Sequence, residues 1–256
     1  MANDSKADAL SVIPVDSIEH AIAQMRQIEQ SLTPPDGLRD FNRMYLGVTE
    51  AVRDRIGADF FANPEFMGRL DIVFANRYFA AVAANLDRTR PPRAWNVLLT
   101  HRHDHDVEAI QFALVGMNAH INFDLAVAVV TTCEELGLAP HDGTLHADYQ
   151  KVDAILDGAE AQVRESFEHG IVRRIDRLLS PVENIVANWS MNSARTAAWV
   201  RARALWHLRS EKELFDDYIA ALDHFVAFAG RSLLIPSPLP TLESFLHRVG
   251  HHAPHR

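Results

Sequence analysis

The chain has 256 residues, long for one domain and short for two, so we expect one large domain. Hydrophobic residues make up 48% of it, which is enough for a substantial core. With 34 acidic against 25 basic residues the formal charge is −9, and such an acidic surface repels phosphate groups, which argues against nucleic acid or an anionic membrane as a partner.

Targeting signals and disulfides are not expected either. Cys133 is the single cysteine, so no internal disulfide can form, and the N-terminus lacks the basic start and apolar run of a secretory signal. The longest uninterrupted apolar stretch near the middle, Leu125 to Val130, is too short to span a bilayer. The sequence therefore predicts a soluble, cytoplasmic protein, and it leaves a homo-oligomer open.

Helix signals dominate the first third of the chain. Asp16 or Ser17 can cap a first helix, and Asn63 followed by Pro64 is a favourable start for a third one. Between them a Pro-Pro-Asp-Gly turn separates two amphipathic stretches. We expect helices over residues 16–32, 38–56 and 63–86.

The middle of the chain alternates a polar and an apolar stretch. Residues 87–106 are polar and proline-containing, which predicts an irregular segment that could serve as the lid or rim of a site. From about Val107 to Leu136 follows a helix that is apolar nearly all round, as expected of the buried centre of a bundle. Further helices are expected over residues 145–169, 182–208 and 211–234.

The predicted fold class is all-α: a single-domain helical bundle with a buried central helix and more than about 60% helix. No run of alternating β-branched residues is long enough for a sheet. The domain organisation is a flexible N-terminus (1–15), the helical domain (16–235), and a Pro-rich break, short helix and His-rich tail (236–256).

The central helix carries five polar side chains on two faces. At 100° per residue, Gln111, Asn118 and Asn122 lie on one line, whereas His120 and Asp124 lie one turn apart on roughly the opposite face. Burying them is unfavourable unless each finds a partner. We expect the first three to bridge neighbouring helices or to bind a substrate, and the last two to form an acid–base pair, a pair of metal ligands or a structural contact.

Polar residues on other helices could face the same site. Asp71 and Tyr78 share a face of the third helix, Tyr45 lies on the second, and Asp148 begins the helix after the central one. Asp71 and Tyr78 are candidate catalytic residues beside His120 and Asp124, and Tyr45 and Asp148 are candidate substrate-binding residues. Each has a structural alternative, which for Asp71 is a buried ion pair with an arginine and for Asp148 is a helix cap.

Motifs for common cofactors are absent from the sequence. The glycines form neither a dinucleotide fingerprint nor a phosphate loop, and no G-x-S-x-G, E-x-x-H or H-E-x-x-H occurs. We therefore expect no cofactor, with a divalent metal as the alternative.

Several short motifs together resemble a known family. They are Phe41-Asn-x-x-Tyr45, Leu70-Asp-x-x-Phe-Ala-x-x-Tyr78, Gly116-Met-Asn-Ala-His-Ile-Asn-x-Asp-Leu125, Asp148-Tyr-x-x-Val152 and Ala194-Arg-x-x-Ala-Trp199. Over residues 36–235 they resemble an actinobacterial family called domain of unknown function 5995. The resemblance implies an all-helical fold with a polar cluster at these positions and brings no reaction with it. The chain departs from the family pattern at Asp153 and Ala126.

Three functions fit these residues. The first is an enzyme acting on a largely apolar small molecule, a cyclase, isomerase or lyase of specialised metabolism, with His120 as general acid–base and Asp124 fixing its tautomer. The second is a metal-dependent hydrolase in which His120 and Asp124 are ligands, completed by Asp71, Asp148 or a histidine of the 101–105 segment. The third is a non-catalytic ligand-binding or scaffolding bundle.

Overall fold

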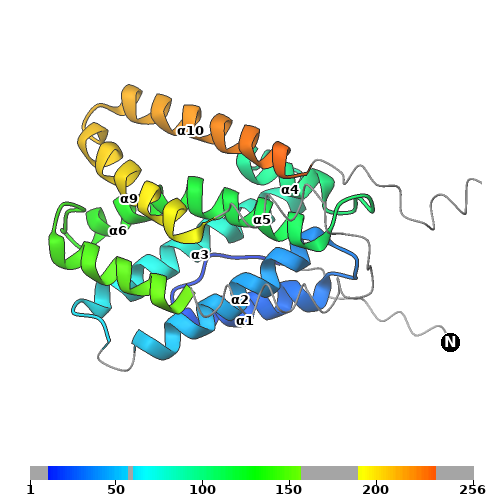
Figure 1. Cartoon of the computed structure of the whole chain (residues 1–256), viewed down its shortest axis with the longest axis horizontal. Helices are drawn as coiled ribbons and strands as arrows, with labels where there is room; N and C mark the ends of the chain where they lie inside the picture. Colours follow the sequence, from blue (N-terminus) through cyan, green and yellow to red (C-terminus); the bar gives the residue numbers. More distant parts are fainter. Residues whose placement is uncertain (1–10, 57–59, 157–189, 235–256) are drawn as a thin grey trace, which may run out of the picture.

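The computed structural model describes residues 11–56, 60–156 and 190–234 (Figure 1). Within these ranges 78% of the residues are helical and none lies in a strand. The predicted all-α fold with a buried apolar central helix is confirmed. The elements are α1 (Ile18–Ser31), α2 (Gly37–Ile56), α3 (Pro64–Leu86), α4 (Arg93–His101), α5 (Ala109–Ala119), η1 (His120–Asp124), α6 (Leu125–Glu135), α9 (Met191–Leu208) and α10 (Lys212–Leu233), and residues 143–156 are also helical.

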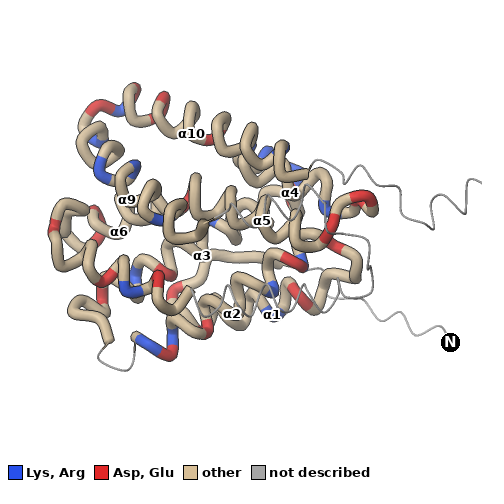
Figure 2. Tube along the Cα trace, in the orientation of Figure 1, with Lys and Arg blue, Asp and Glu red and all other residues tan. Residues whose placement is uncertain are grey.

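The centre of the bundle is the continuous helical stretch α5–η1–α6. In Figure 1 this stretch runs across the middle of the molecule, with α1 and α2 on one side and α10 on the other. Figure 2 shows α5 free of charged residues, and every residue of α5 after Ala109 is buried. An all-round apolar helix is stable here because neighbouring helices cover it on several sides.

The same stretch, Ala109–Glu135, is by length and composition apolar enough to cross a membrane, and among the described helices it alone meets that test. However, 94% of its most apolar window is buried inside the protein. Packing against the neighbouring helices is therefore a sufficient reason for its apolar composition.

Local capping signals placed the first helices correctly. The Ser17 side chain accepts a hydrogen bond of 3.2 Å from the backbone N–H of His20 at the start of α1. Asn63 accepts one of 3.0 Å from Phe66 at the start of α3, where Pro64 is the first helical residue. A cap and a proline at the first position satisfy or remove N–H groups that the helix leaves unpaired, so both starts follow from the sequence.

The prediction of an irregular segment over residues 87–106 was wrong in its middle, which forms α4. This helix has no side-chain cap of its own. Instead the carboxylate of Asp223, on α10, accepts hydrogen bonds from the backbone N–H groups of Arg93 (2.9 Å) and Ala94 (2.8 Å). A nine-residue helix is too short to be stable alone, so contacts distant in sequence stabilise it, and Trp95 and Leu98 are completely buried.

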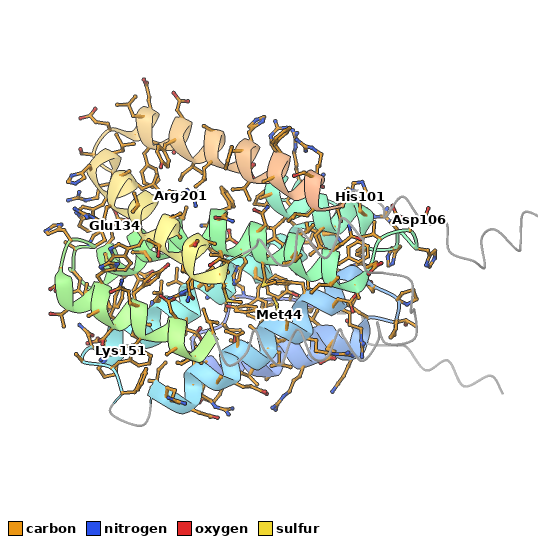
Figure 3. All side chains as sticks on the ribbon, in the orientation of Figure 1. Met44, His101, Asp106, Glu134, Lys151 and Arg201 are labelled. Carbon is orange, nitrogen blue, oxygen red and sulfur yellow. The ribbon has the colours of Figure 1, made fainter. Side chains whose placement is uncertain are left out.

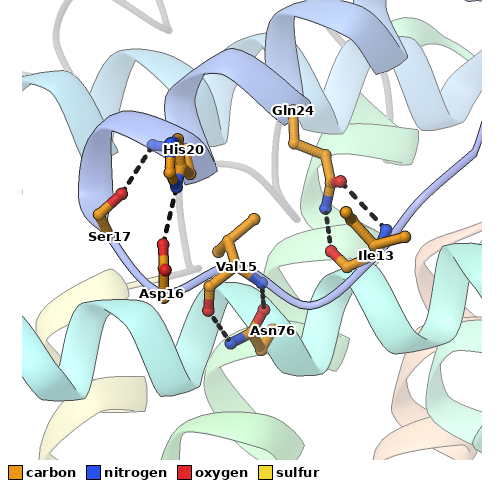
Figure 4. A network of polar contacts seen from close by, with 7 residues as sticks. All are labelled: Ile13, Val15, Asp16, Ser17, His20, Gln24 and Asn76. Atoms are coloured by element: carbon orange, nitrogen blue, oxygen red, sulfur yellow. Dashed lines mark hydrogen bonds and ion pairs between the residues drawn. The ribbon is translucent and has the colours of Figure 1, made fainter.

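The chain before α1 is attached to the bundle at two points (Figure 4). The backbone of Ile13 exchanges two hydrogen bonds with the side-chain amide of Gln24 on α1, at 3.1 and 2.7 Å. The backbone of Val15 does the same with Asn76 on α3, at 2.7 and 2.8 Å. Residues 13–15, assigned above to a flexible N-terminus, therefore lie as an extended strap across α1 and α3.

The predicted helical residues 157–169 and 182–189, and the break, short helix and His-rich tail over 236–256, lie outside the described residues.

Candidate functional site

The candidate site is built on a π-helical turn, η1, between α5 and α6. The backbone N–H of Leu125 donates to the carbonyl of His120, five residues earlier, instead of to the usual fourth residue. Single π-turns inside α-helices occur frequently at functional sites. The turn begins at His120 and ends at Asp124, the two residues singled out from the sequence, which are 2% and 1% exposed.

The carboxylate of Asp124 is fully engaged by N–H donors. Its Oδ1 accepts from Arg77 Nε at 3.0 Å, and its Oδ2 accepts from Trp95 Nε1 at 2.7 Å. The same Oδ2 lies 3.3 Å from Nδ1 of His120. Because an ionised carboxylate can only accept, we assign the proton of a neutral His120 to Nδ1, which leaves a lone pair on Nε2.

The imidazole of His120 is enclosed by aromatic rings. Phe74 stacks on it with 3.5 Å between ring centroids and 4° between the planes, and Tyr45 approaches edge-on at 4.4 Å. Burial lowers the pKa of His120, so the ring is neutral at pH 7. Nε2 is buried and has no hydrogen-bond partner in the described structure. Three further aromatic rings lie around the imidazole, with 5.8, 6.2 and 5.7 Å between ring centroids for Phe41, Tyr78 and Trp95.

His120 forms part of the wall of an apolar cavity between α2, α3, η1 and α9. The volume of this cavity is about 70 Å³, whereas a single water molecule needs roughly 10–15 Å³. The cavity therefore has room for a molecule larger than one water. Its wall includes four methionines, whose flexible side chains adapt to the shape of a ligand; they are Met44, labelled in Figure 3, and Met67, Met117 and Met191.

Asp71 also lines this cavity, and it has no cationic partner among the described residues. Its Oδ2 is buried and accepts no hydrogen bond from the part of the chain that the structure describes, and burial raises the pKa of Asp71 to about 7. The structural alternative, a buried ion pair with an arginine, is not found within residues 11–56, 60–156 and 190–234. Arg77 pairs with Asp124 at 3.0 Å, and Arg195 pairs with Asp153 at 2.6 Å.

Tyr45 is the third polar residue of the cavity wall. Its hydroxyl is buried without a hydrogen-bond partner in the described part of the chain, and burial raises the pKa of Tyr45 well above its ordinary value. Its ring contacts His120, and its candidate role in binding a substrate stays a prediction.

Tyr78 and Asp148 lie outside the cavity wall. The hydroxyl of Tyr78 donates to Asn42 Oδ1 at 3.0 Å, within the aromatic group around His120. Asp148 accepts from the backbone N–H groups of Ala62 (2.9 Å) and Asn63 (2.6 Å) and from Lys151 Nζ (2.8 Å). These contacts give Asp148 a structural role, since it holds the segment that leads into α3.

The opposite face of the central helix connects it to α9 and α10. Asn118 Nδ2 donates to the carbonyl of Val226 at 2.9 Å, and its Oδ1 accepts from Asn122 Nδ2 at 3.2 Å. Gln111 Nε2 donates to the carbonyl of Leu233 at 2.8 Å. Asn122 Oδ1 accepts from Arg201 Nη1 at 3.1 Å, with Arg201 labelled in Figure 3. These are the helix-bridging contacts expected above, and none of the three side chains lines the cavity.

Metal ligands are not grouped in the described ranges. No set of three or more His, Cys, Asp or Glu side chains there is placed to hold an ion. At the site itself, N–H groups already occupy both oxygens of Asp124.

Sequence reasoning missed the residues that hold Asp124 and His120 in place. Trp95 lies in a segment expected to be irregular, although a buried indole N–H generally needs an acceptor, and that was the available signal. Arg77, six residues after Asp71 on α3, pairs with Asp124 and not with Asp71.

The sequence of the chain matches one known protein family. The profile described as Family of unknown function (DUF5995) matches residues 18–236, from the start of α1 to beyond α10. The chain belongs to this family. The motif from Gly116 to Leu125, by which the sequence resembles DUF5995, contains the π-turn and the buried pair His120 and Asp124. No curated protein and no solved structure is similar enough to the chain to count as a match.

Proposed function

We propose that this DUF5995 protein is an enzyme that acts on a small, largely apolar molecule by acid–base chemistry, as a cyclase, isomerase or lyase. The observation that carries the proposal is Nε2 of His120: within the described residues this nitrogen is buried and has no partner, it belongs to a residue that lines an apolar cavity, and its ring is fixed by Asp124. A polar atom left unsatisfied in the core is unfavourable, so its retention indicates a role other than stability.

The roles of the residues follow from their contacts. His120 takes a proton through Nε2 and becomes an imidazolium, which the carboxylate of Asp124 stabilises through Nδ1. Arg77 and Trp95 fix the carboxylate and so fix the orientation of the ring. The apolar wall excludes water from the reacting atoms, and Asp71 and Tyr45 provide polar contacts to the substrate. This chemistry requires no cofactor.

The experiment is a comparison of metabolite profiles. A small-molecule extract is incubated with the wild-type protein or with His120→Gln, which removes the titratable ring while keeping similar bulk, and both mixtures are analysed by mass spectrometry. We expect the wild type alone to convert at least one apolar compound, because loss of a positioned proton carrier costs about 10²- to 10⁴-fold in rate.

The matched control is Asn118→Ala, on the opposite face of the same helix, whose amide bridges to α10. It should lower stability and leave the conversion in place. If the wild type and His120→Gln give the same profile with every extract, the acid–base role of His120 is refuted.

A further inference from the structure

Three residues that line the cavity each carry a buried polar atom with no hydrogen-bond partner in the described structure. The atoms are Oδ2 of Asp71 on α3, the hydroxyl of Tyr45 on α2 and Nε2 of His120 on η1. The side chains lie together because Phe74, three residues after Asp71 on the same face of α3, stacks on the imidazole, and the ring of Tyr45 touches that imidazole edge-on. Each atom comes from a different element, so their grouping follows from the fold.

The three atoms share one hydrogen-bonding character. An ionised carboxylate accepts only, Nε2 of His120 accepts because the proton is on Nδ1, and a tyrosine hydroxyl can do either. A bound group that complements Asp71 and His120 must therefore bring N–H or O–H donors, and Tyr45 can accept a further one. An alkylammonium group has that inventory, whereas a hydroxyl has one donor and a carboxylate has none.

The surroundings of Asp71 also favour a positively charged group on the bound molecule. Aromatic rings of Phe41, Tyr45 and Phe74 line the cavity, and aromatic faces attract cations electrostatically. Arg195 is the basic residue of the wall within the described ranges, and its charge is balanced by Asp153 at 2.6 Å, while its Nη2 donates to the carbonyl of Tyr149. Among the described residues, the carboxylate of Asp71 is thus left without a counter-ion.

We infer that the molecule bound in this cavity is an apolar amine, whose ammonium group donates hydrogen bonds to Asp71 and Tyr45. The inference rests on the proposed function in that it names the substrate class of the same site. The ammonium group anchors one end of the molecule beside Asp71, and the adjoining carbon skeleton then lies among the methionines and against Nε2 of His120.

The test uses three probes of similar shape and different charge: cyclohexylammonium, cyclohexanol and cyclohexanecarboxylate. Binding of each to the full chain is measured by isothermal titration calorimetry at pH 8, where the amine is charged and Asp71, with a pKa of about 7, is ionised. We expect cyclohexylammonium to bind about tenfold or more tightly than cyclohexanol, the typical effect of one charge-assisted hydrogen bond, and the carboxylate to bind weakest. The smaller pair isobutylammonium and isobutanol is measured as well, so that the comparison covers two sizes.

Two variants locate the effect. Asp71→Asn keeps the shape of the side chain and should reduce cyclohexylammonium binding to the level of cyclohexanol, while cyclohexanol binding stays within about twofold. The matched control, Asp153→Asn, alters the other carboxylate near the cavity and should preserve the preference for the ammonium probe.

The inference is overturned if neither ammonium probe binds better than its alcohol, or if the preference survives in Asp71→Asn. Its failure differs from that of the proposed function. If ammonium binding depends on Asp71 but no His120-dependent conversion is found, the protein binds amines and the proposed enzyme activity is wrong. If neutral compounds are converted and ammonium is not preferred, the proposed enzyme activity stands and the amine inference is wrong.

Discussion

Gly116 lies on α5, one turn before the π-turn, where a side chain would collide with the aromatic group around His120. A Cβ atom at this position would come within 2.3, 2.4 and 2.8 Å of three atoms of Phe41. Phe41 is 1% exposed and contacts the rings of Tyr78 and Trp95 at 5.2 Å each. We predict that Gly116→Ala destabilises the protein because this ring can shift only by giving up its contacts with Tyr78 and Trp95.

The magnitude follows from two opposing contributions. Replacing a helical glycine by alanine stabilises by about 0.5–1 kcal/mol when the space is free. Overpacking a filled core costs about 1–3 kcal/mol. A contact at 2.3 Å requires a shift of about 1 Å by a ring held on several sides, so the cost lies at the upper end of that range. We expect a net loss of about 1–2 kcal/mol.

The matched control is Gly47→Ala on α2, an exposed helical position with nothing within 4 Å of the added Cβ. It should gain about 0.5–1 kcal/mol. In thermal unfolding followed by circular dichroism, with about 2–4 °C per kcal/mol for a chain of this size, the melting temperature should fall for Gly116→Ala and rise for Gly47→Ala. Equal or higher stability of Gly116→Ala than of Gly47→Ala would show that Phe41 is not confined as described.

The two remaining predictions concern the carboxylates of the site. Asp124→Ala should cost about 3–5 kcal/mol in urea unfolding, because the partly buried Arg77 and the buried indole N–H of Trp95 both lose their acceptor. Adding Arg77→Leu should recover part of this cost. A cost below about 1 kcal/mol would contradict the role of Asp124 as the shared acceptor. Asp71→Asn should instead raise the free energy of unfolding, and this gain should grow with pH. The reason is that the pKa of Asp71 in the folded protein, about 7, exceeds the ordinary 3.8, so that Asp71 lowers stability as the pH rises from about 4 to 7. The gain in unfolding free energy at pH 8 should exceed that at pH 5 by at least about 1 kcal/mol, since one pKa unit corresponds to about 1.4 kcal/mol. His120 changes stability with pH in the opposite direction, but it does so equally in the wild type and in the variant, so the difference between them is unaffected. A gain that does not change with pH would mean that Asp71 is ionised normally.

The elements that the sequence predicted well are those with local causes. Ser17 and Asn63 cap the helices they precede, and the all-round apolar pattern of α5 and α6 placed the buried centre. The bridging face of the central helix follows from the helical period, and Asn118 bridges to α10 as expected. On the other face His120 lines the cavity, and its catalytic role stays a prediction.

The elements that it missed depend on contacts between distant residues. α4 is capped by Asp223, which lies 130 residues from Arg93, and no local pattern contains that information. The partners of Asp124 were missed for the same reason, since Trp95 reaches the site only on α4. The π-turn changes the hydrogen bonding of a few residues without altering the apolar pattern by which a helix is predicted.

The dependence of α4 on α10 has a consequence for the order in which the site is completed during synthesis. His120 and Asp124 leave the ribosome about a hundred residues before Asp223, and until then α4, which carries Trp95, lacks its cap. Gln111 and Asn118 also wait for the carbonyls of α10. A nascent chain that ends before residue 212 therefore contains the whole Gly116–Leu125 motif and Arg77, but it lacks the contacts by which α10 holds the start of α4. The site should reach its final form only when the last described helix emerges.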